Sequence, residues 1–261
     1  MTVPFSLRRR AVLHGSLALG ALLAAPSLCA ELVEAVPRIR PSVVAVGTYM
    51  PNRNPAFRFL GTGFAVGDGR LIATNAHVVP EVLDSERMEV VAIAMASGQT
   101  GVVRRAERVA SDKEHDLAVL RIEGAALPAL ELAPNDGVRE GQSIAFTGFP
   151  IGNALGLSPV THRGIVSAIT PIGIPQANAR DLNPALIRRL SGERFEIYQL
   201  DATAYPGNSG SPVFDPGSGQ IIGVINMVFV KRTKESVLSD PSGISYAIPV
   251  TYLRAMLQGL R

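Results

Sequence analysis

Two groups of short segments with strand character, six in each group, constrain what this chain can fold into. Each segment is rich in β-branched residues and is bounded by Gly, Pro, Asn or Asp, as strands joined by turns are. No helical crossover pattern separates the segments within a group, so we expect an all-β fold of two antiparallel six-stranded β-barrels. The segments are residues 42–49, 57–66, 70–73, 88–94, 100–110 and 117–122, and residues 143–148, 159–170, 198–201, 212–214, 220–230 and 245–248.

The composition agrees with this fold class. The chain has 25 Gly and 19 Pro, only 5% aromatic residues, and 47% apolar residues. Many short strands joined by turns use Gly and Pro in this way, and the apolar content supplies a core for one large or two small domains.

Two helices are expected outside the strands, and a third segment could be helical or extended. Residues 251–260 carry apolar side chains at Leu253, Met256, Leu257 and Leu260, the spacing of an amphipathic C-terminal helix. Residues 185–190 follow Asn-Pro and predict a short helix inside a long connection, 173–196. Residues 31–40 indicate a short helix or extended arm before the first barrel. The long connection is interpreted as a solvated insertion, with a loop that gates the cleft as the alternative.

The first 29 residues have the three parts of an export signal. Arg8, Arg9 and Arg10 precede an apolar stretch over residues 11–25, and small residues follow. The stretch is shorter than the roughly 20 residues of a membrane span. We therefore predict a signal peptide over residues 1–29, cleaved after Cys29. Cleavage after Ala30 is a less favoured alternative, because it would place Leu28 at the −3 position, where a small residue is preferred. A single mature domain would follow over residues 30–261, in the periplasm or secreted. The tandem arginines also fit a twin-arginine signal, and an uncleaved leader that acts as a membrane anchor is a further alternative.

The charge balance argues against a nucleic-acid partner. Lys and Arg total 25 and Asp and Glu total 22, and the three basic residues of the leader account for the difference. The rest of the chain is neutral, with no basic patch for a polyanion. Cys29 is the only cysteine, which excludes a disulfide and a thiolate metal site, and the histidines show no ligand spacing. We expect neither a metal nor another cofactor.

Ser209 is the candidate nucleophile. It lies in Gly-Asn-Ser-Gly, where the glycines at 207 and 210 permit a tight turn that exposes the hydroxyl and points backbone N–H groups at an oxyanion. Taken alone, such a motif is more often a polar hairpin loop.

His77 and Asp116 are the candidate base and its orienting acid. His77 ends an apolar strand in Thr-Asn-Ala-His, where a rigid element can aim it into a cleft. Asp116 directly precedes the strand 117–122, at the edge of the core. A purely structural role is the alternative for each residue: His77 would be a hydrogen-bonded core or surface histidine, and Asp116 would be an aspartate that caps a strand. His115 and His162 are the other histidines of the mature chain, and Asp112 and Asp201 are rival acids.

The order of the three candidates selects between hydrolase classes. His, Asp and Ser follow one another in the order of chymotrypsin-type enzymes, whereas α/β-hydrolases run Ser, Asp, His and require Gly-x-Ser-x-Gly. Ser211 stands where that motif needs its second glycine.

The sequence resembles the HtrA/Deg family of trypsin-like serine proteases over nearly all of residues 31–261. The matching segments include Gly-Thr-Gly-Phe at 61–64, Thr-Asn-Ala-His-Val-Val at 74–79, Asp-Leu-Ala-Val-Leu at 116–120, Gly-Ile-Val-Ser-Ala at 164–168 and Gly-Asn-Ser-Gly at 207–210. The resemblance implies a chymotrypsin-like pair of barrels, a serine endopeptidase activity without zymogen cleavage, and the triad His77, Asp116 and Ser209. It also implies an oxyanion hole in the loop Gly207–Asn208–Ser209, from the amides of Gly207 and Ser209.

The same resemblance implies the partners and the substrate pocket. Polypeptides with unfolded or exposed segments would be the substrates, and a homotrimer is the family's usual assembly. Well-known members carry PDZ domains after the protease domain, whereas here we expect a trypsin-like protease domain without PDZ over residues 30–261. The primary specificity pocket would be bounded by Thr203, Asn226, Met227, Val228 and Tyr246. Thr203 stands where enzymes specific for Lys or Arg carry Asp, so we expect cleavage after Val, Ala, Ile or Leu. A catalytically silent binding protein and an esterase on the same fold are the alternatives.

Overall fold

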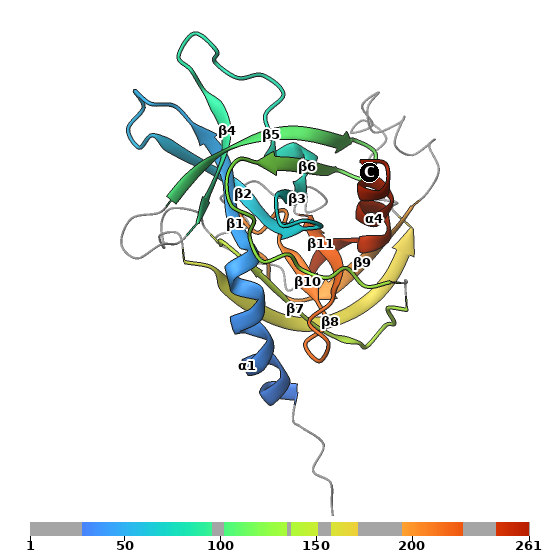
Figure 1. The fold of residues 1–261 in the computed structure, drawn as a ribbon. Coiled ribbons are helices and arrows are strands. Elements are labelled where there is room, and N and C mark those ends of the chain that lie inside the picture. The colour runs from blue at the N-terminus through green and yellow to red at the C-terminus, as the bar shows by residue number, and fades with distance from the viewer. Residues whose placement is uncertain are drawn as a thin grey trace, which may run out of the picture.

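The computed structural model describes residues 28–95, 102–134, 137–150, 158–171, 195–226 and 244–260, and it forms two closed barrels (Figure 1). The first barrel contains β1 (Val43–Tyr49), β2 (Phe57–Val66), β3 (Leu71–Asn75), β4 (Val90–Met95), β5 (Val102–Asp112) and β6 (Leu117–Ile122). The second contains β7 (Ser143–Gly148), β8 (Val160–Pro171), β9 (Glu196–Asp201), β10 (Pro212–Phe214), β11 (Ile221–Asn226) and β12 (Ile244–Pro249). The strands close in the orders β1-β2-β3-β6-β5-β4 and β10-β11-β12-β9-β8-β7.

The predicted pair of antiparallel six-stranded barrels is confirmed. Strand ends differ from the expected ones by a few residues, as at β3, which extends to Asn75, and β9, which starts at Glu196. The C-terminal helix is also confirmed as α4 (Val250–Gln258), which buries Val250 and Leu253 and contacts β11 and β12.

The N-terminal segment is helical. It forms α1 (Leu28–Ile39), followed by the 3-10 helix η1 (Arg40–Ser42), so the expected helix starts three residues earlier than the sequence indicated. Residues 1–27 of the predicted leader and the predicted helix at 185–190 lie outside the described residues, whereas the last two residues of that leader, 28 and 29, belong to α1. Among the residues described, no helix is long and apolar enough to cross a membrane.

One apolar cluster joins the two barrels. In β6, Leu117 and Val119 belong to a cluster that also holds Phe146 and Leu200 of the second barrel, whereas Leu120 belongs to the core of the first barrel. Successive side chains of a strand point to opposite faces, so β6 is buried on both sides and its sequence is almost continuously apolar. The strand that follows Asp116 is therefore fixed by both cores.

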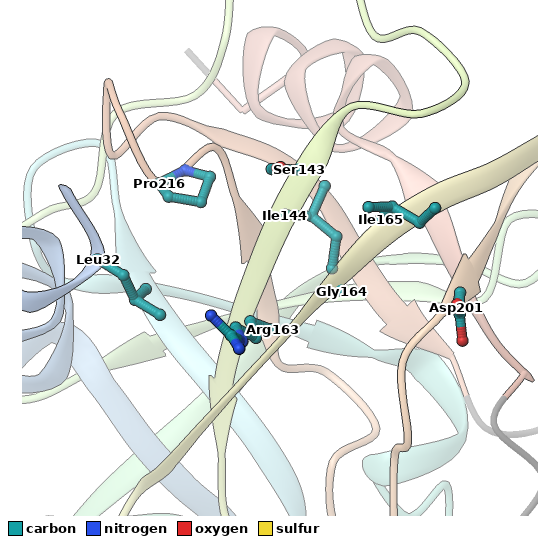
Figure 2. Close-up of a pocket in the computed structure, with 8 residues that line it drawn as sticks. All are labelled: Leu32, Ser143, Ile144, Arg163, Gly164, Ile165, Asp201 and Pro216. Atoms are coloured by element: carbon teal, nitrogen blue, oxygen red, sulfur yellow. The ribbon is translucent and has the colours of Figure 1, made fainter. Parts of the chain in front are cut away.

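An open pocket of about 300 Å³ lies where α1 meets the second barrel (Figure 2). Leu32 of α1 faces it, together with Ile144 of β7, Arg163 of β8 and Pro216. The pocket marks the side of the second barrel on which the N-terminal helix rests.

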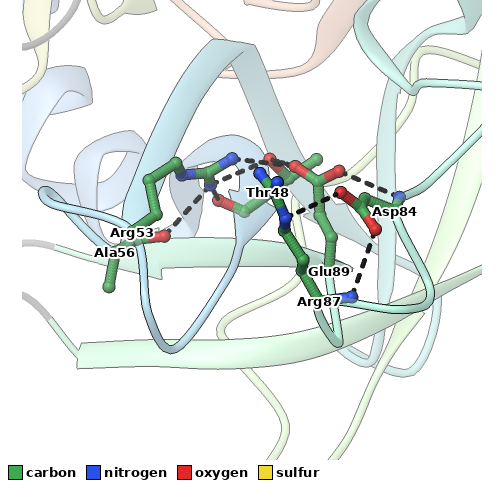
Figure 3. A network of polar contacts seen from close by, with 6 residues as sticks. All are labelled: Thr48, Arg53, Ala56, Asp84, Arg87 and Glu89. Atoms are coloured by element: carbon green, nitrogen blue, oxygen red, sulfur yellow. Dashed lines mark hydrogen bonds and ion pairs between the residues drawn. The ribbon is translucent and has the colours of Figure 1, made fainter.

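A polar network ties the β1–β2 connection to the start of β4 (Figure 3). Arg53 donates to Glu89 Oε1 at 2.8 Å and to Thr48 O at 2.6 Å, and Thr48 Oγ1 donates to the same Glu89 oxygen at 2.6 Å. The Asp84 N–H donates to Glu89 Oε2 at 3.2 Å. The Thr48 hydrogen bond is the main cause that lowers the pKa of Glu89; the Asp84 amide and Arg53 add to it and outweigh the opposing effect of burial.

Replacing Glu89 by Gln should lower the free energy of unfolding by about 1–3 kcal/mol, because the charge-assisted hydrogen bonds of Arg53 weaken. The folded-state pKa of Glu89 is lowered, so its contribution is complete above the unfolded pKa and is lost as pH falls through the folded value. Urea unfolding should therefore show a difference between wild type and Glu89→Gln that shrinks in acid.

The matched control is Glu81→Gln. Glu81 pairs with Lys113 at the surface, where the two side chains are 64% and 76% exposed, and little change in stability is expected there. Equal losses in the two variants would contradict the importance of the network around Glu89.

Candidate active site

His77 and Asp116 lie in hydrogen-bond contact at one edge of the first barrel. His77 belongs to the 3-10 helix η2 (Ala76–Val78), directly after β3, and Asp116 stands directly before β6, the strand paired with β3. His77 Nδ1 lies 2.6 Å from Asp116 Oδ2, and the His77 backbone N–H donates to Asp116 Oδ1 at 2.9 Å. Because a carboxylate only accepts, Nδ1 carries the proton and Nε2 is left as the acceptor that a general base needs.

Asp116 adopts a left-handed backbone conformation that its surroundings support. Its φ is 52°, and its carbonyl oxygen accepts from Asn75 Nδ2 at 3.0 Å and from the Ala76 N–H at 3.1 Å. Its side chain is 6% exposed, and Asn226 Nδ2 donates to Oδ2 at 2.8 Å. Burying a carboxylate is costly unless donors replace water, and His77 and Asn226 supply those donors from the two barrels.

Asn226 is thus a partner of Asp116, which the sequence did not indicate. The family resemblance had implied a place for Asn226, the last residue of β11, in the specificity pocket. Its amide is wholly buried and points to the carboxylate. The only sign of this role in the sequence was the residue type, because an Asn that is buried at the end of a strand needs hydrogen-bond partners.

The turn before Asp116 is held by a second histidine–aspartate pair. Asp112 Oδ1 accepts from the N–H groups of Glu114 and His115, and Asp112 Oδ2 lies 2.6 Å from His115 Nδ1. The His115 ring stacks on Tyr252 of α4, with centroids 4.0 Å apart. Burial acts to raise the pKa of Asp112, but the His115 and Glu114 contacts outweigh it and the pKa is lowered. His115 therefore connects the C-terminal helix to the turn that presents Asp116.

His162, the other rival histidine, lies on β8 in an apolar setting. Its ring stacks on Phe146 with centroids 4.9 Å apart, and burial lowers its pKa. His162 Nε2 has no hydrogen-bond partner among the described residues. Asp201, the remaining rival acid, is exposed at the end of β9.

Ser209 lies in the loop before β10, next to the turn of His77. A methyl group added at Gly61 would lie 2.7 Å from Val78 Cγ2 and 3.0 Å from Ser209 O. The turn that holds His77 and the loop that holds Ser209 therefore both pack closely against Gly61. Among the described residues no hydrogen bond joins the His77 ring to Ser209. In the absence of substrate such catalytic contacts are often long, and they shorten in the enzyme–substrate complex.

The backbone amides of Gly207 and Ser209 donate no hydrogen bond within the described residues, whereas their neighbours do. The Asn208 N–H donates to Tyr205 O and the Gly210 N–H to Ile225 O, both at 2.9 Å. Gly207 has a φ of 104°, which a residue with a side chain rarely adopts. These two amides are the pair that the family resemblance implies for the oxyanion hole.

The predicted pocket residues that are described lie on neighbouring segments. Asn226 pairs with Tyr246 between β11 and β12. Ser245 Oγ donates to Ala202 O at 2.6 Å and accepts from the Ala204 N–H at 3.0 Å, so it holds the backbone on both sides of Thr203. Met227 and Val228 lie outside the described residues, as does most of the connection 173–196.

The family model of the trypsin-like peptidase domain matches residues 61–224. The chain belongs to the trypsin-like peptidase family. This membership confirms the resemblance drawn from the motifs around residues 61, 77, 116 and 209.

Relatives of this trypsin-like chain carry HtrA and DegP names. It is 30% identical over 204 residues to a protein of Halomonas elongata named "Probable periplasmic serine endoprotease DegP-like", covering 78% of the chain and 35% of that protein. It is 34% identical over 202 residues to the mitochondrial serine protease HTRA2 of Bos taurus, covering 76% of the chain and 35% of that protein. The chain thus spans about a third of the length of these relatives.

Solved HtrA-type structures share the fold of the trypsin-like chain. A serine endoprotease from Yersinia pestis superposes with a TM-score of 0.60 at 28% identity, covering 88% of this chain and 66% of that one. The HtrA-type protease AlgW with a tripeptide gives the same TM-score and identity, covering 88% of this chain and 63% of that one.

Replacing Gly210 by Ala should destabilise the protein more than replacing Gly141 by Ala. Both glycines have a left-handed φ, 87° and 82°, so both variants incur a strain of about 1–2 kcal/mol. A Cβ at Gly210 would also lie 2.0 Å from Thr62 O, whereas nothing lies within 4 Å at Gly141. The backbone clash should add about 1–3 kcal/mol in urea unfolding. Similar losses in both variants would show that the loop of residues 207–210 is not packed against β2 as described.

Proposed function

We propose that this chain is a serine endopeptidase that cleaves polypeptides by acyl transfer. The observation that carries the proposal is the 2.6 Å contact between His77 Nδ1 and Asp116 Oδ2. It lies beside a loop with Ser209 and two amides, of Gly207 and Ser209, that donate no hydrogen bond to any residue the structure describes. Its family membership and the protease names of its relatives support it.

The proposed reaction begins at Ser209. His77 Nε2 takes the proton from Ser209 Oγ as that oxygen attacks the scissile carbonyl. The Asp116 carboxylate holds the imidazole in the required tautomer and stabilises the imidazolium that forms. The developing oxyanion accepts from the amides of Gly207 and Ser209, each contributing on the order of 3 kcal/mol to transition-state stabilisation. His77 then protonates the leaving amine, and water hydrolyses the acyl-enzyme in a second step of the same kind.

The proposed specificity is for small or medium aliphatic residues before the scissile bond. Thr203 lies between Ala202 and Ala204, two small residues that are almost fully buried, and offers no negative charge to a cationic side chain. Val228, by its place in the family pattern, would narrow the pocket further.

The proposed cellular setting is an exported compartment. Residues 1–29 would direct export, with the protease domain over residues 30–261 acting in the periplasm or outside the cell. The periplasmic name of the Halomonas elongata relative supports this assignment. Assembly into a homo-oligomer belongs to the same proposal, on the pattern of the family.

Ser209→Ala should abolish labelling by a fluorophosphonate probe, because the probe requires an activated serine hydroxyl. Labelling of purified protein is the measurement, with Ser211→Ala as the matched control. Ser211 lies in the same loop, but it is wholly buried, so its loss should leave labelling intact. A well-folded wild-type chain that takes no label would favour the alternative, a silent binding protein on a protease fold.

Peptide libraries should show cleavage after Val, Ala, Ile or Leu in preference to Arg. Thr203→Asp should raise the ratio of Arg to Val cleavage by about tenfold or more, because a carboxylate in the pocket attracts the cation and disfavours the apolar side chain. Thr203→Val, which matches Thr in size, should keep the wild-type preference. A wild-type preference for Arg would refute the assignment of Thr203 to the pocket.

A further inference from the structure

We propose that Thr62, in the first barrel, is a positioning residue for the oxyanion amides of the second barrel. The inference rests on the proposed serine endopeptidase function and adds a residue that the triad and the oxyanion hole do not include. Thr62 lies on β2, is wholly buried, and contacts the nucleophile loop with both its hydroxyl and its backbone.

The direction of the Thr62 hydroxyl hydrogen bond follows from its two partners. Thr62 Oγ1 lies 2.7 Å from Gly207 O and 3.1 Å from the amide nitrogen of Phe149. The Phe149 N–H can only donate, so the hydroxyl accepts from it and turns its own proton to the Gly207 carbonyl. Because the Phe149 N–H fixes the orientation of the Thr62 hydroxyl, the hydroxyl in turn holds the Gly207 carbonyl in one orientation.

The Gly207 carbonyl belongs to the peptide plane that separates the two proposed oxyanion donors. The Gly207 N–H lies on the plane before it and the Ser209 N–H on the plane after it. The middle plane is held at both ends, by Thr62 Oγ1 at the Gly207 carbonyl and by Tyr205 O at the Asn208 N–H. The torsions of Gly207 and Asn208 join this plane to the two neighbouring planes, and Gly207 offers little steric resistance to a change in its torsions, so the contacts of the middle plane help to keep the donors in place.

Thr62 also fixes the carbonyl on the other side of the Ser209 amide. Its backbone N–H donates to Ser209 O at 2.8 Å, and the adjoining Gly210 N–H donates to Ile225 O at 2.9 Å. Its own carbonyl accepts from Thr74 Oγ1 at 2.7 Å, in the strand that leads to His77. One residue therefore links the loop of the nucleophile to the strand of the base. The Thr62 hydroxyl is the group that orients the peptide plane between Gly207 and Asn208.

Thr62→Val keeps the shape of the side chain and removes the hydroxyl. We expect kcat on a peptide substrate to fall by about 10- to 100-fold, less than the 10²- to 10³-fold loss of an oxyanion donor itself, with KM changed by less than about threefold. Affinity for a peptide aldehyde, whose hemiacetal oxygen occupies the oxyanion hole, should fall by the same factor as kcat. Thr62→Ser, which keeps a hydroxyl at this position, should have a kcat and an aldehyde affinity close to those of the wild type.

Thr48→Val is the matched control for a purely structural effect. Thr48 is a buried threonine of the neighbouring strand β1, and its hydroxyl hydrogen-bonds to Glu89, away from the nucleophile loop. Its loss should lower stability and leave kcat and aldehyde affinity at the wild-type values. If Thr62→Val does not fold, the pair Thr62→Ser and Thr62→Ala isolates the same hydroxyl, and the same fold-change in kcat is expected between them.

The outcomes separate this inference from the function it rests on. A wild-type chain that neither labels nor cleaves, or a Ser209→Ala chain that still cleaves, overturns the proposed function and the role of Thr62 with it. An active wild type whose Thr62→Val variant keeps kcat and aldehyde affinity overturns only the role of Thr62. Equal losses of kcat in Thr62→Val and Thr48→Val would also overturn it, since both would then reflect stability alone.

Discussion

The buried carboxylate of Asp116 is the constraint on which the candidate site depends. An ionised group in this position is tolerated only if donors replace the water it has lost. His77 supplies donors from the first barrel, and Asn226 supplies one from the second. The carboxylate therefore has all three of these donors only when the two barrels are packed together.

The apolar cluster that spans both barrels supplies the free energy for that packing. Leu117 and Val119 lie in it together with Phe146 and Leu200, and β6 carries the first two directly after Asp116. Burial of such side chains is the dominant favourable contribution to folding, and close packing leaves the cluster little room to shift. The polar contacts of the site are thus held by an apolar frame and do not themselves have to join the barrels.

The proposed chemistry is divided between the barrels in the same way. The base follows one strand of the first barrel and its acid precedes the paired strand, whereas the nucleophile and the amides of Gly207 and Ser209 lie in a loop of the second barrel. Thr62 crosses this division from the first barrel, with hydrogen bonds to Gly207 and Ser209. A buried interface with several satisfied polar contacts is rigid, which suits groups that must be oriented before the substrate arrives.

What the sequence by itself determined about this protein is local. Runs of β-branched residues between turn residues predicted both barrels, and short motifs singled out His77, Asp116 and Ser209, because strand periodicity and turn chemistry are written in neighbouring residues. Only the tertiary structure decided that Asn226 donates to Asp116, 110 residues away in the chain, and that Thr62 donates to Gly207, 145 residues away. It also decided that Asp116 takes a left-handed backbone conformation, which Asn75 and Ala76 support. These features depend on which surfaces the two barrels bring together, and no window of sequence contains both partners of such a contact.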